Sequence, residues 1–484
     1  MNTQPEFQCD ASVLAAKWQS ALTGLSANVV SVHGYDRPVL IEGGAYPGIW
    51  LECGPLEGSI YGMVDPDVAV DNHRIFFRQQ HADGYLPCYI WKDRSGKSQI
   101  QMVVPIAATA WDVFQQQGDI AFLDEAYRAC CAWDAWLLRW RNTRGTGLCE
   151  AFCEYDTGHD NSPRFAGLPH EAQGGDARHC PTDPRLPYLA PDLSATVYGG
   201  RRALAQMADR LGRADEARTW NAAAEQIRKN LLALCFDPQS ECFYDLDPNL
   251  QFVRIRGDLL TRVLGEHIPD QTLFDKIWGC HLGNPEGFWT PFPFPSIAIN
   301  DPSFVRPIPG NSWGGAAQAL TALSAPRWME HYGKHANLTW LMQRWIQALC
   351  ADSDFRQQMD PVSGVFSPDS GRYSPAMLVL IDFVRRLHGT VHLPDRIEWG
   401  CLPLESGRYW HWRNGRATII HNEGRTHLHL DSSSIAEVIG PCRLVTDQTN
   451  GIDLISNNFT GFLHTDAAAF AGSIVPVFAS ASIG

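Results

Sequence analysis

Carboxylate and amide side chains are concentrated in the stretch Cys149 to Phe165, which reads CEAFCEYDTGHDNSPRF. Within it, Gly158 and Pro163 exclude a regular amphipathic helix along the whole stretch. We interpret it as the end of one element followed by a turn that points carboxylates at a ligand. Our hypothesis is that the ligand is a sugar, and the alternative is a solvated acidic loop.

The aromatic content fits a sugar-binding protein. The chain has 17 tryptophans in 484 residues, and 45% of its residues are hydrophobic, enough for a large core. Aromatic faces are natural stacking platforms for sugar rings, although core packing remains the default explanation of any single tryptophan.

The 14 cysteines are interpreted as reduced core thiols, since a chain of this length without an export signal is not a typical disulfide scaffold. Three Glu-Cys neighbours, at Glu52-Cys53, Cys149-Glu150 and Cys153-Glu154, would suit a soft metal such as zinc. The C-x₃-C spacing is not a standard zinc spacing, so we expect no metal and no cofactor.

Charge and hydropathy exclude other classes of partner. The formal charge is −14, and no cluster of Lys and Arg offers a nucleic-acid footprint. No run of 18 apolar residues predicts a membrane span. The first ten residues, MNTQPEFQCD, lack the pattern of a secretory signal, so we expect a cytoplasmic protein. The oligomeric state is left open.

Helical periodicity recurs through residue 390, and long irregular segments separate the helices. The expected helices are 12–30, the first part of 72–91, 102–117, 120–141, 193–212, 214–235, 257–265, 270–279, 316–323, 326–332, 335–352 and 376–388, with a short hairpin at 236–256. No alternation of strands and helices predicts a parallel sheet. The pattern favours a mainly α fold: an (α/α)₆ toroid over residues 1–390, with the chemistry in the loops of one rim.

After residue 390 the sequence changes to short alternating segments with Gly and Asn turns, as in RYWHWRNG and THLHLD. This predicts a small antiparallel β-domain over residues 391–484. His411, His421, His427 and His429 lie there, and their alternation indicates strand faces rather than a metal site.

Asp156 to Phe165, DTGHDNSPRF, resembles the SGxDNSPR segment of the α/α-toroid glycosidases of glycoside hydrolase family 63, which includes mannosylglycerate hydrolases, trehalase-like proteins and processing α-glucosidases. Other similar segments follow the family's order: QHADGYLP (Gln80–Pro87), the helical hairpin Met207–Leu231, the proline-rich loop Phe288–Phe304 and NSWGG (Asn311–Gly315). The likeness covers about residues 50–390.

The resemblance implies an inverting, exo-acting glycoside hydrolase in which Asp160 is the general acid. It places the general base at Gln357, before the turn MDPVSG, and an amide cannot act as a base. Asp360 and Glu286 are the alternative carboxylates. The open alternatives are a phosphorylase, in which phosphate is the nucleophile, a metal glycosidase using Cys149 or Cys153, and a carbohydrate-binding protein without catalysis.

The resemblance also implies a set of sugar-binding residues. Trp50, Trp289 and Trp313 would stack on sugar rings, and Glu52, Gln80, Asp83, Asp156, Asn161, Arg164 and Asn311 would hydrogen-bond hydroxyl groups. Core packing is the alternative for each tryptophan, and turn formation before Gly84 is the alternative for Asp83. Two positions depart from the family pattern. Trp50-Leu-Glu-Cys stands where the family has a Trp-Asp pair, and Asp156 stands where it has a Glu. These departures suggest a distinct substrate.

Overall fold

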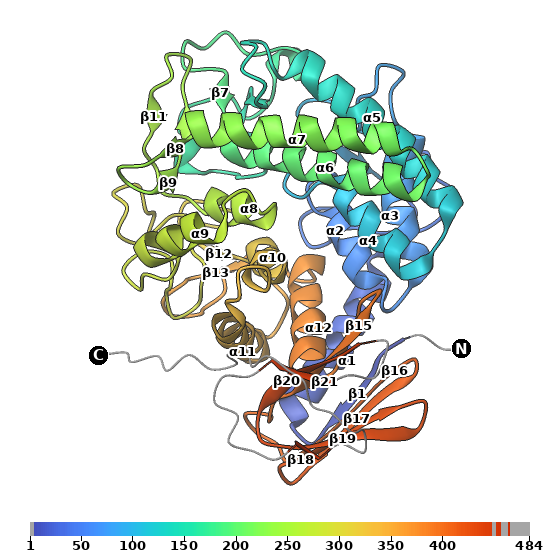
Figure 1. Ribbon diagram of the computed structural model, residues 1–484. Helices are drawn as coiled ribbons and strands as arrows, with labels where there is room; N and C mark the ends of the chain where they lie inside the picture. Colours follow the sequence, from blue (N-terminus) through green and yellow to red (C-terminus); the bar gives the residue numbers. More distant parts are fainter. Residues whose placement is uncertain (1–3, 448–451, 456–462, 465–484) are drawn as a thin grey trace.

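A computed structural model describes residues 4–447, 452–455 and 463–464, and its helices form a closed ring (Figure 1). The inner helices are α2 (Gly54–Tyr61), α4 (Ile106–Gln117), α6 (Pro191–Arg210), α8 (Leu259–Gly265), α10 (Ala319–Met329) and α12 (Ser374–His388). The outer helices are α3 (Pro66–Arg78), α5 (Ile120–Trp140), α7 (Ala214–Leu234), α9 (Gln271–Ile277), α11 (His335–Ala351) and α1 (Ser12–Ala27). Each inner helix contacts the next, and α12 contacts α2, which closes the predicted α/α toroid.

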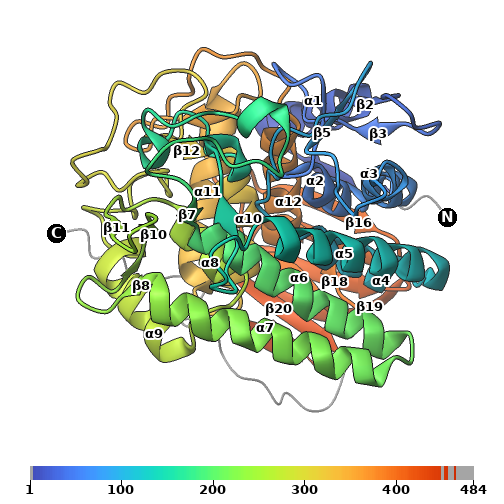
Figure 2. The ribbon, with the colours of Figure 1, turned by 90° about the horizontal axis from the view of Figure 1, so that it is seen from above.

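The burial of the two kinds of helix explains why they alternate. Every residue of α8 is buried, including the polar Thr261 and Arg262, as expected for an inner helix that is enclosed on all sides. In contrast, α7 buries only one stripe, formed by Ala217, Ala224, Ile227 and Leu231. This amphipathic pattern packs one face of α7 on α6 and leaves the other face to solvent (Figure 2).

The connections have very different lengths at the two ends of the ring. The links from inner to outer helix are short, such as residues 211–213 between α6 and α7. The links from outer to inner helix are long, such as residues 141–190 between α5 and α6. The candidate site segments therefore all precede inner helices and gather at one rim, where the inner helices have their N-termini.

Short antiparallel strand pairs tie the long connections together. They are β2 (Val29–Val30) with β3 (Val39–Leu40), β4 (Gly48–Trp50) with β5 (Tyr89–Trp91), β8 (Phe236–Asp237) with β9 (Cys242–Phe243), β12 (Ala317–Gln318) with β13 (Gln358–Met359), and the sheet β11-β10-β7-β6, made of Phe252–Val253, Asp245–Leu246, Tyr188–Leu189 and Glu150–Ala151. The pair β12–β13 brings the segment of Asn311 beside the segment of Gln357.

The C-terminal antiparallel sheets lie at one side of the ring (Figure 1). One has the order β14-β15-β20-β21 (Thr390–His392, Arg396–Cys401, Cys442–Asp447, Ile452–Ile455), and the other β1-β16-β17-β18-β19-β22 (Glu6–Cys9, Tyr409–Asn414, Ala417–Asn422, Arg425–Leu430, Ser433–Ile439, Leu463–His464). The sequence did not predict the edge strand β1, because a segment of four residues is too short to show the alternating pattern of a strand. It places Phe7 against Trp18 and Trp412.

Two helices, α2 and α10, depart most clearly from the sequence prediction. Helix α2 lies in a Gly- and Pro-rich segment for which no helix was predicted. Its Pro55 occupies the first turn, where proline is tolerated, and a Cβ at Gly58 would meet Asn72 at 2.4 Å. Helix α10 continues through Pro326, so the two predicted helices are one. In the described part of the chain, no helix has both the length and the apolar character that a membrane span requires.

Candidate active site

Asp160 is held in the loop before α6 by contacts from the loop before α10. Asn311 Nδ2 donates to Asp160 Oδ2 at 3.1 Å, and the Trp313 N–H donates to the Asp160 carbonyl oxygen at 2.9 Å. Asn161 adopts a left-handed conformation (φ 57°), and its side-chain amide donates to the Asn311 carbonyl oxygen at 2.8 Å. The two loops therefore fix the Asp160 carboxyl group together.

Gln357 is connected to the same group of side chains. Its Nε2 donates to Asn311 Oδ1 at 3.1 Å, and Tyr46 Oη donates to its Oε1 at 2.8 Å. Both ends of the Gln357 amide thus have defined partners. Asp160, the predicted general acid, and Gln357, at the position of the family's general base, therefore lie on either side of Asn311.

Two further carboxyl groups adjoin Asp160 from the loop before α2. Glu52 is buried and accepts a hydrogen bond from Gln101, and a Cβ at Gly158 would lie 2.5 Å from Glu52 Oε2. Burial, with added repulsion from Asp160, raises the pKa of Glu52 to about 8. Glu42 accepts from Tyr373 Oη at 2.8 Å, and burial raises its pKa well above the ordinary value. Burial therefore favours the protonated form of both carboxyl groups.

The pKa of Asp160 is raised to about 6, chiefly by burial. The hydrogen bond from Asn311 opposes this rise, the negative charge of Glu154 adds to it, and the positive charge of His170 lowers the pKa. Below about pH 6 the Asp160 carboxyl carries a proton that it can donate, as a general acid must.

Aromatic side chains surround these carboxyl groups. Trp50 and Trp313 share one buried cluster with Cys53 and Leu320, against which Tyr46, Tyr89 and Trp91 pack. Two of the three predicted stacking tryptophans therefore lie together beside Asp160. The third does not, because Trp289 packs in a separate cluster with Trp278, Phe294 and Trp340.

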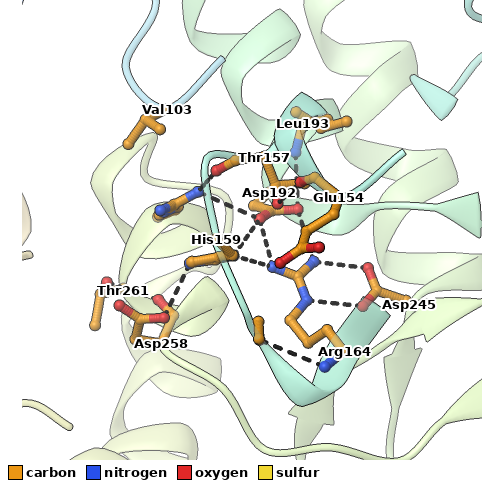
Figure 3. A network of polar contacts seen from close by, with 12 residues as sticks. Val103, Glu154, Thr157, His159, Arg164, Asp192, Leu193, Asp245, Asp258 and Thr261 are labelled. Carbon is orange, nitrogen blue, oxygen red and sulfur yellow. Dashed lines mark hydrogen bonds and ion pairs between the residues drawn. The ribbon is translucent and has the colours of Figure 1, made fainter. Parts of the chain in front are cut away.

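Arg164 belongs to a buried ion network rather than to a free surface for hydroxyl groups (Figure 3). Its guanidinium binds Asp245 at 2.8 Å and Asp192 at 2.9 Å, and also contacts His159. Each guanidinium nitrogen is bound to a protein partner. The prediction that Arg164 binds sugar is therefore corrected: its side chain fixes the base of the Asp160 loop.

Asp156 is likewise occupied by the protein. It pairs with Arg141, both side chains being fully buried, and it accepts the N–H groups of Ile100 and Phe152 at 2.8 and 2.7 Å. A carboxylate with this many donors has no capacity left for a sugar hydroxyl. Its role is to anchor the loop.

Gln80 and Asp83 lie in a turn that packs on α5. Gln80 Nε2 donates to the carbonyl oxygens of Gly84 and Ala129, both at 2.9 Å. Asp83 accepts from the Tyr85 N–H and from Trp136 Nε1, both at 3.2 Å. These contacts support the turn interpretation, and they do not join the two residues to the Asp160 group.

Neither alternative base carboxylate, Asp360 or Glu286, has a hydrogen bond to Asn311 or Gln357 in the described part of the chain. Asp360 accepts the N–H groups of Val362 and Ser363, each at 2.9 Å, and lies 3.2 Å from Arg306. Burial acts to raise the pKa of Asp360, but these backbone donors and Arg306 lower it overall. Glu286 is exposed in the loop before α10.

The cysteine alternative has no structural support. Cys149 and Cys153 are buried, and burial raises the pKa of both thiols, so neither is a ready thiolate. Across the described ranges, no three His, Cys, Asp or Glu side chains are grouped to hold a metal ion.

Sequence reasoning did not assign roles to five residues of this site: Glu42, Tyr46, Gln101, Glu154 and His170. Glu154 lay within the acidic stretch and His170 in the long irregular loop that follows, so the region was visible but the partners were not. Tyr46 follows the Gly43-Gly44 turn, and this was the only local signal for it.

Comparison with known proteins assigns the family. Residues 60–374 match the family described as the mannosylglycerate hydrolase MGH1-like glycoside hydrolase domain. The chain belongs to the MGH1-like glycoside hydrolases. No curated protein sequence matches this family member.

Solved structures share the fold of this MGH1-like hydrolase. A family 63 mannosylglycerate hydrolase from Thermus thermophilus, in complex with Tris and D-glycerate, matches with a TM-score of 0.62 and 18% identity over 77% of this chain and 100% of that one. Neutral trehalase from Saccharomyces cerevisiae matches at 0.56 and 13% over 75% and 79%. A family 78 rhamnosidase from Bacillus sp. GL1 matches at 0.60 and 9% over 99% and 44%.

Proposed function

We propose that this protein cleaves a short oligosaccharide or small glycoside from its end, with Asp160 as general acid. The observation that carries the proposal is the environment of Asp160: a carboxyl group with a raised pKa, fixed by Asn311 and surrounded by Trp50, Trp313 and Tyr46. Membership of a glycoside hydrolase family supports the same reaction class.

In the proposed step, protonated Asp160 donates to the glycosidic oxygen as the bond to the anomeric carbon breaks. Water attacks the opposite face of the sugar, which inverts the anomeric configuration. Gln357 can accept a hydrogen bond from this water through Oε1 and so orient it, but its amide cannot take the proton. The proton that the attacking water loses therefore passes to a second solvent water. Glu52 and Glu42, whose protonated forms are favoured by burial, can hydrogen-bond the sugar hydroxyls, with the aromatic cluster packing on the ring.

The amide at Gln357 specifically favours a second candidate, phosphorolysis. Inorganic phosphate is already an anion at neutral pH, so it needs no general base to attack the anomeric carbon. The products would then be a sugar 1-phosphate and the released aglycone. The same acid, Asp160, would serve both reactions.

The test is product release from a panel of α- and β-glycosides that includes mannosylglycerate, trehalose and aryl rhamnosides, with and without phosphate. We expect a free sugar whose configuration, followed by proton NMR during the first turnovers, is opposite to that of the substrate. A product of retained configuration would overturn the inverting mechanism. A sugar 1-phosphate formed only with phosphate would establish the second candidate.

A further inference from the structure

The acidic loop contains a second carboxylate, Glu154, that is 3% exposed and is not needed for any proposed chemical step. Its Oε1 accepts the backbone N–H of Asn161, the residue directly after Asp160. Its Oε2 lies 2.5 Å from Nδ1 of His170, which belongs to the long loop before α6. One carboxylate therefore joins the peptide that carries the acid to an imidazole 16 residues further along.

Backbone contacts hold this arrangement. The Glu154 N–H donates to the Pro169 carbonyl oxygen at 3.0 Å, and the Tyr155 N–H donates to the His170 carbonyl oxygen at 3.1 Å. The His170 ring also stacks on Tyr155 at 5.3 Å with an interplanar angle of 25°. His170 is fixed on its inner side, while 59% of its side chain is exposed to solvent.

We propose that Glu154 and His170 are a positioning pair for Asp160: Glu154 fixes the Asp160–Asn161 peptide, and the two opposite charges set the pH range in which Asp160 holds its proton. The inference rests on the proposed role of Asp160 as general acid. Neither residue touches the reacting atoms in this scheme, so both act through Asp160.

The electrostatic part of the inference follows from the signs of the charges. The Glu154 carboxylate disfavours ionisation of Asp160, and a protonated His170 favours it. The other groups that face Asp160 are Asn311 from the loop before α10, Glu52, Glu42 and Tyr46 from the loop before α2, and Tyr155 on its own segment. Glu154 and His170 differ from these groups because they act on Asp160 with opposite signs and can each be replaced by an uncharged glutamine.

The test compares the pH dependence of kcat/KM in Glu154→Gln and His170→Gln with the wild type. Glutamine at 154 can still accept the Asn161 N–H, so the turn is retained while the negative charge is lost. We expect the alkaline limb of the kcat/KM profile to shift to lower pH by roughly half to one unit in Glu154→Gln, and to higher pH by a similar amount in His170→Gln. His179→Gln, an exposed histidine of the same loop, is the matched control and should leave the limb unchanged.

The positioning part is tested by Glu154→Ala, which removes the acceptor as well as the charge. We expect kcat to fall at least tenfold with KM little changed, and Glu154→Gln to retain most of kcat. The electrostatic role would be overturned if the alkaline limb of the kcat/KM profile shifted in the same direction in Glu154→Gln and His170→Gln, or did not shift in either. Equal kcat values for Glu154→Ala and Glu154→Gln would overturn the positioning role.

A measurement without turnover separates this inference from the proposed function. Infrared titration of the ligand-free protein, subtracting the spectrum of Asp160→Asn, reports the protonation of the Asp160 carboxyl group directly. Opposite shifts in the two glutamine variants would support the pair even if no glycoside were cleaved. Unchanged titration of Asp160 in both variants would contradict the pair even if hydrolysis were confirmed.

Discussion

Asp160 and Gln357 are linked by one intervening side chain: Asn311 donates to Asp160 Oδ2 through its nitrogen and accepts from Gln357 Nε2 through its oxygen, both at 3.1 Å. The Asn311 amide can reverse its orientation only if both neighbours change their hydrogen-bonding character. The acid position and the amide position are therefore coupled, and a change at one should alter the other.

The first prediction concerns the amide. Gln357→Glu places a carboxylate beside Asn311 and Tyr46, where it can accept a proton from water. A general base contributes roughly 10²–10⁴-fold in such reactions, so we expect hydrolysis of aryl glycosides to rise at least tenfold. Gln357→Leu, which removes the amide without adding a carboxylate, is the control. Equal rates for the two variants would show that position 357 does not face the attacking water.

The second prediction concerns pH. As a general acid, Asp160 must be protonated, and its pKa is raised to about 6. Activity should therefore be highest below this value and should fall as the pH rises through it. The measurement is kcat/KM from pH 4 to 9 at constant ionic strength. A rate that increased with pH through 6 would instead require an ionised Asp160.

The third prediction uses two glycines in left-handed turns. A Cβ at Gly158 (φ +63°) would lie 2.5 Å from Glu52 Oε2, whereas a Cβ at Gly145 (φ +67°) would meet no atom within 4 Å. Alanine at either position costs about 1–2 kcal/mol of backbone strain. Only Gly158→Ala should also displace the Glu52 carboxyl group and lower kcat/KM at least tenfold. Thermal unfolding and kinetics of both variants check this, and equal activity losses would count against a role for Glu52 in the site.

The fourth prediction concerns Glu57, a fully buried side chain on α2. Burial raises its pKa from 4.5 to about 8, although the Cys53 thiol opposes this rise. The folded protein therefore binds more protons than the unfolded chain between about pH 4.5 and 8, and stability decreases as the pH rises through that window. Its contribution is fully present below pH 4.5 and is lost by about pH 8.

Glu57→Gln should remove this dependence. We expect the free energy of unfolding of the variant, relative to the wild type, to increase by roughly 3–5 kcal/mol between pH 5 and 9. Urea unfolding at several pH values measures it, with the exposed Glu286→Gln as control. Parallel pH profiles for the wild type and Glu57→Gln would show that Glu57 titrates normally.

The sequence supported the architecture better than the site. Helical periodicity and the positions of the long loops were enough for an α/α toroid, because amphipathic helices of this kind must pack in pairs. They were not enough for α2, whose glycines allow close approach to α3, or for strand β1, whose partner β16 lies about 400 residues away.

Within the site, the motif Asp156–Phe165 located Asp160 but not the roles of its neighbours. Asp156, Asn161 and Arg164 are all polar, and the sequence alone does not distinguish their roles. The structure shows that Asp156 and Arg164 form buried ion pairs, whereas Asn161 hydrogen-bonds across two loops. Pairings such as Glu154 with His170, or Tyr46 with Gln357, join separate loops and have no local signature.

The most direct test of the proposed function is product release by the wild type and by Asp160→Asn on the same glycoside panel, with folding checked by circular dichroism. Asparagine preserves the shape of Asp160 and can still contact Asn311, but it cannot donate a proton to the glycosidic oxygen. The account predicts that the wild type releases sugar and that Asp160→Asn loses at least a hundredfold in kcat/KM on substrates with poor leaving groups. A folded Asp160→Asn variant that is as active as the wild type would contradict it.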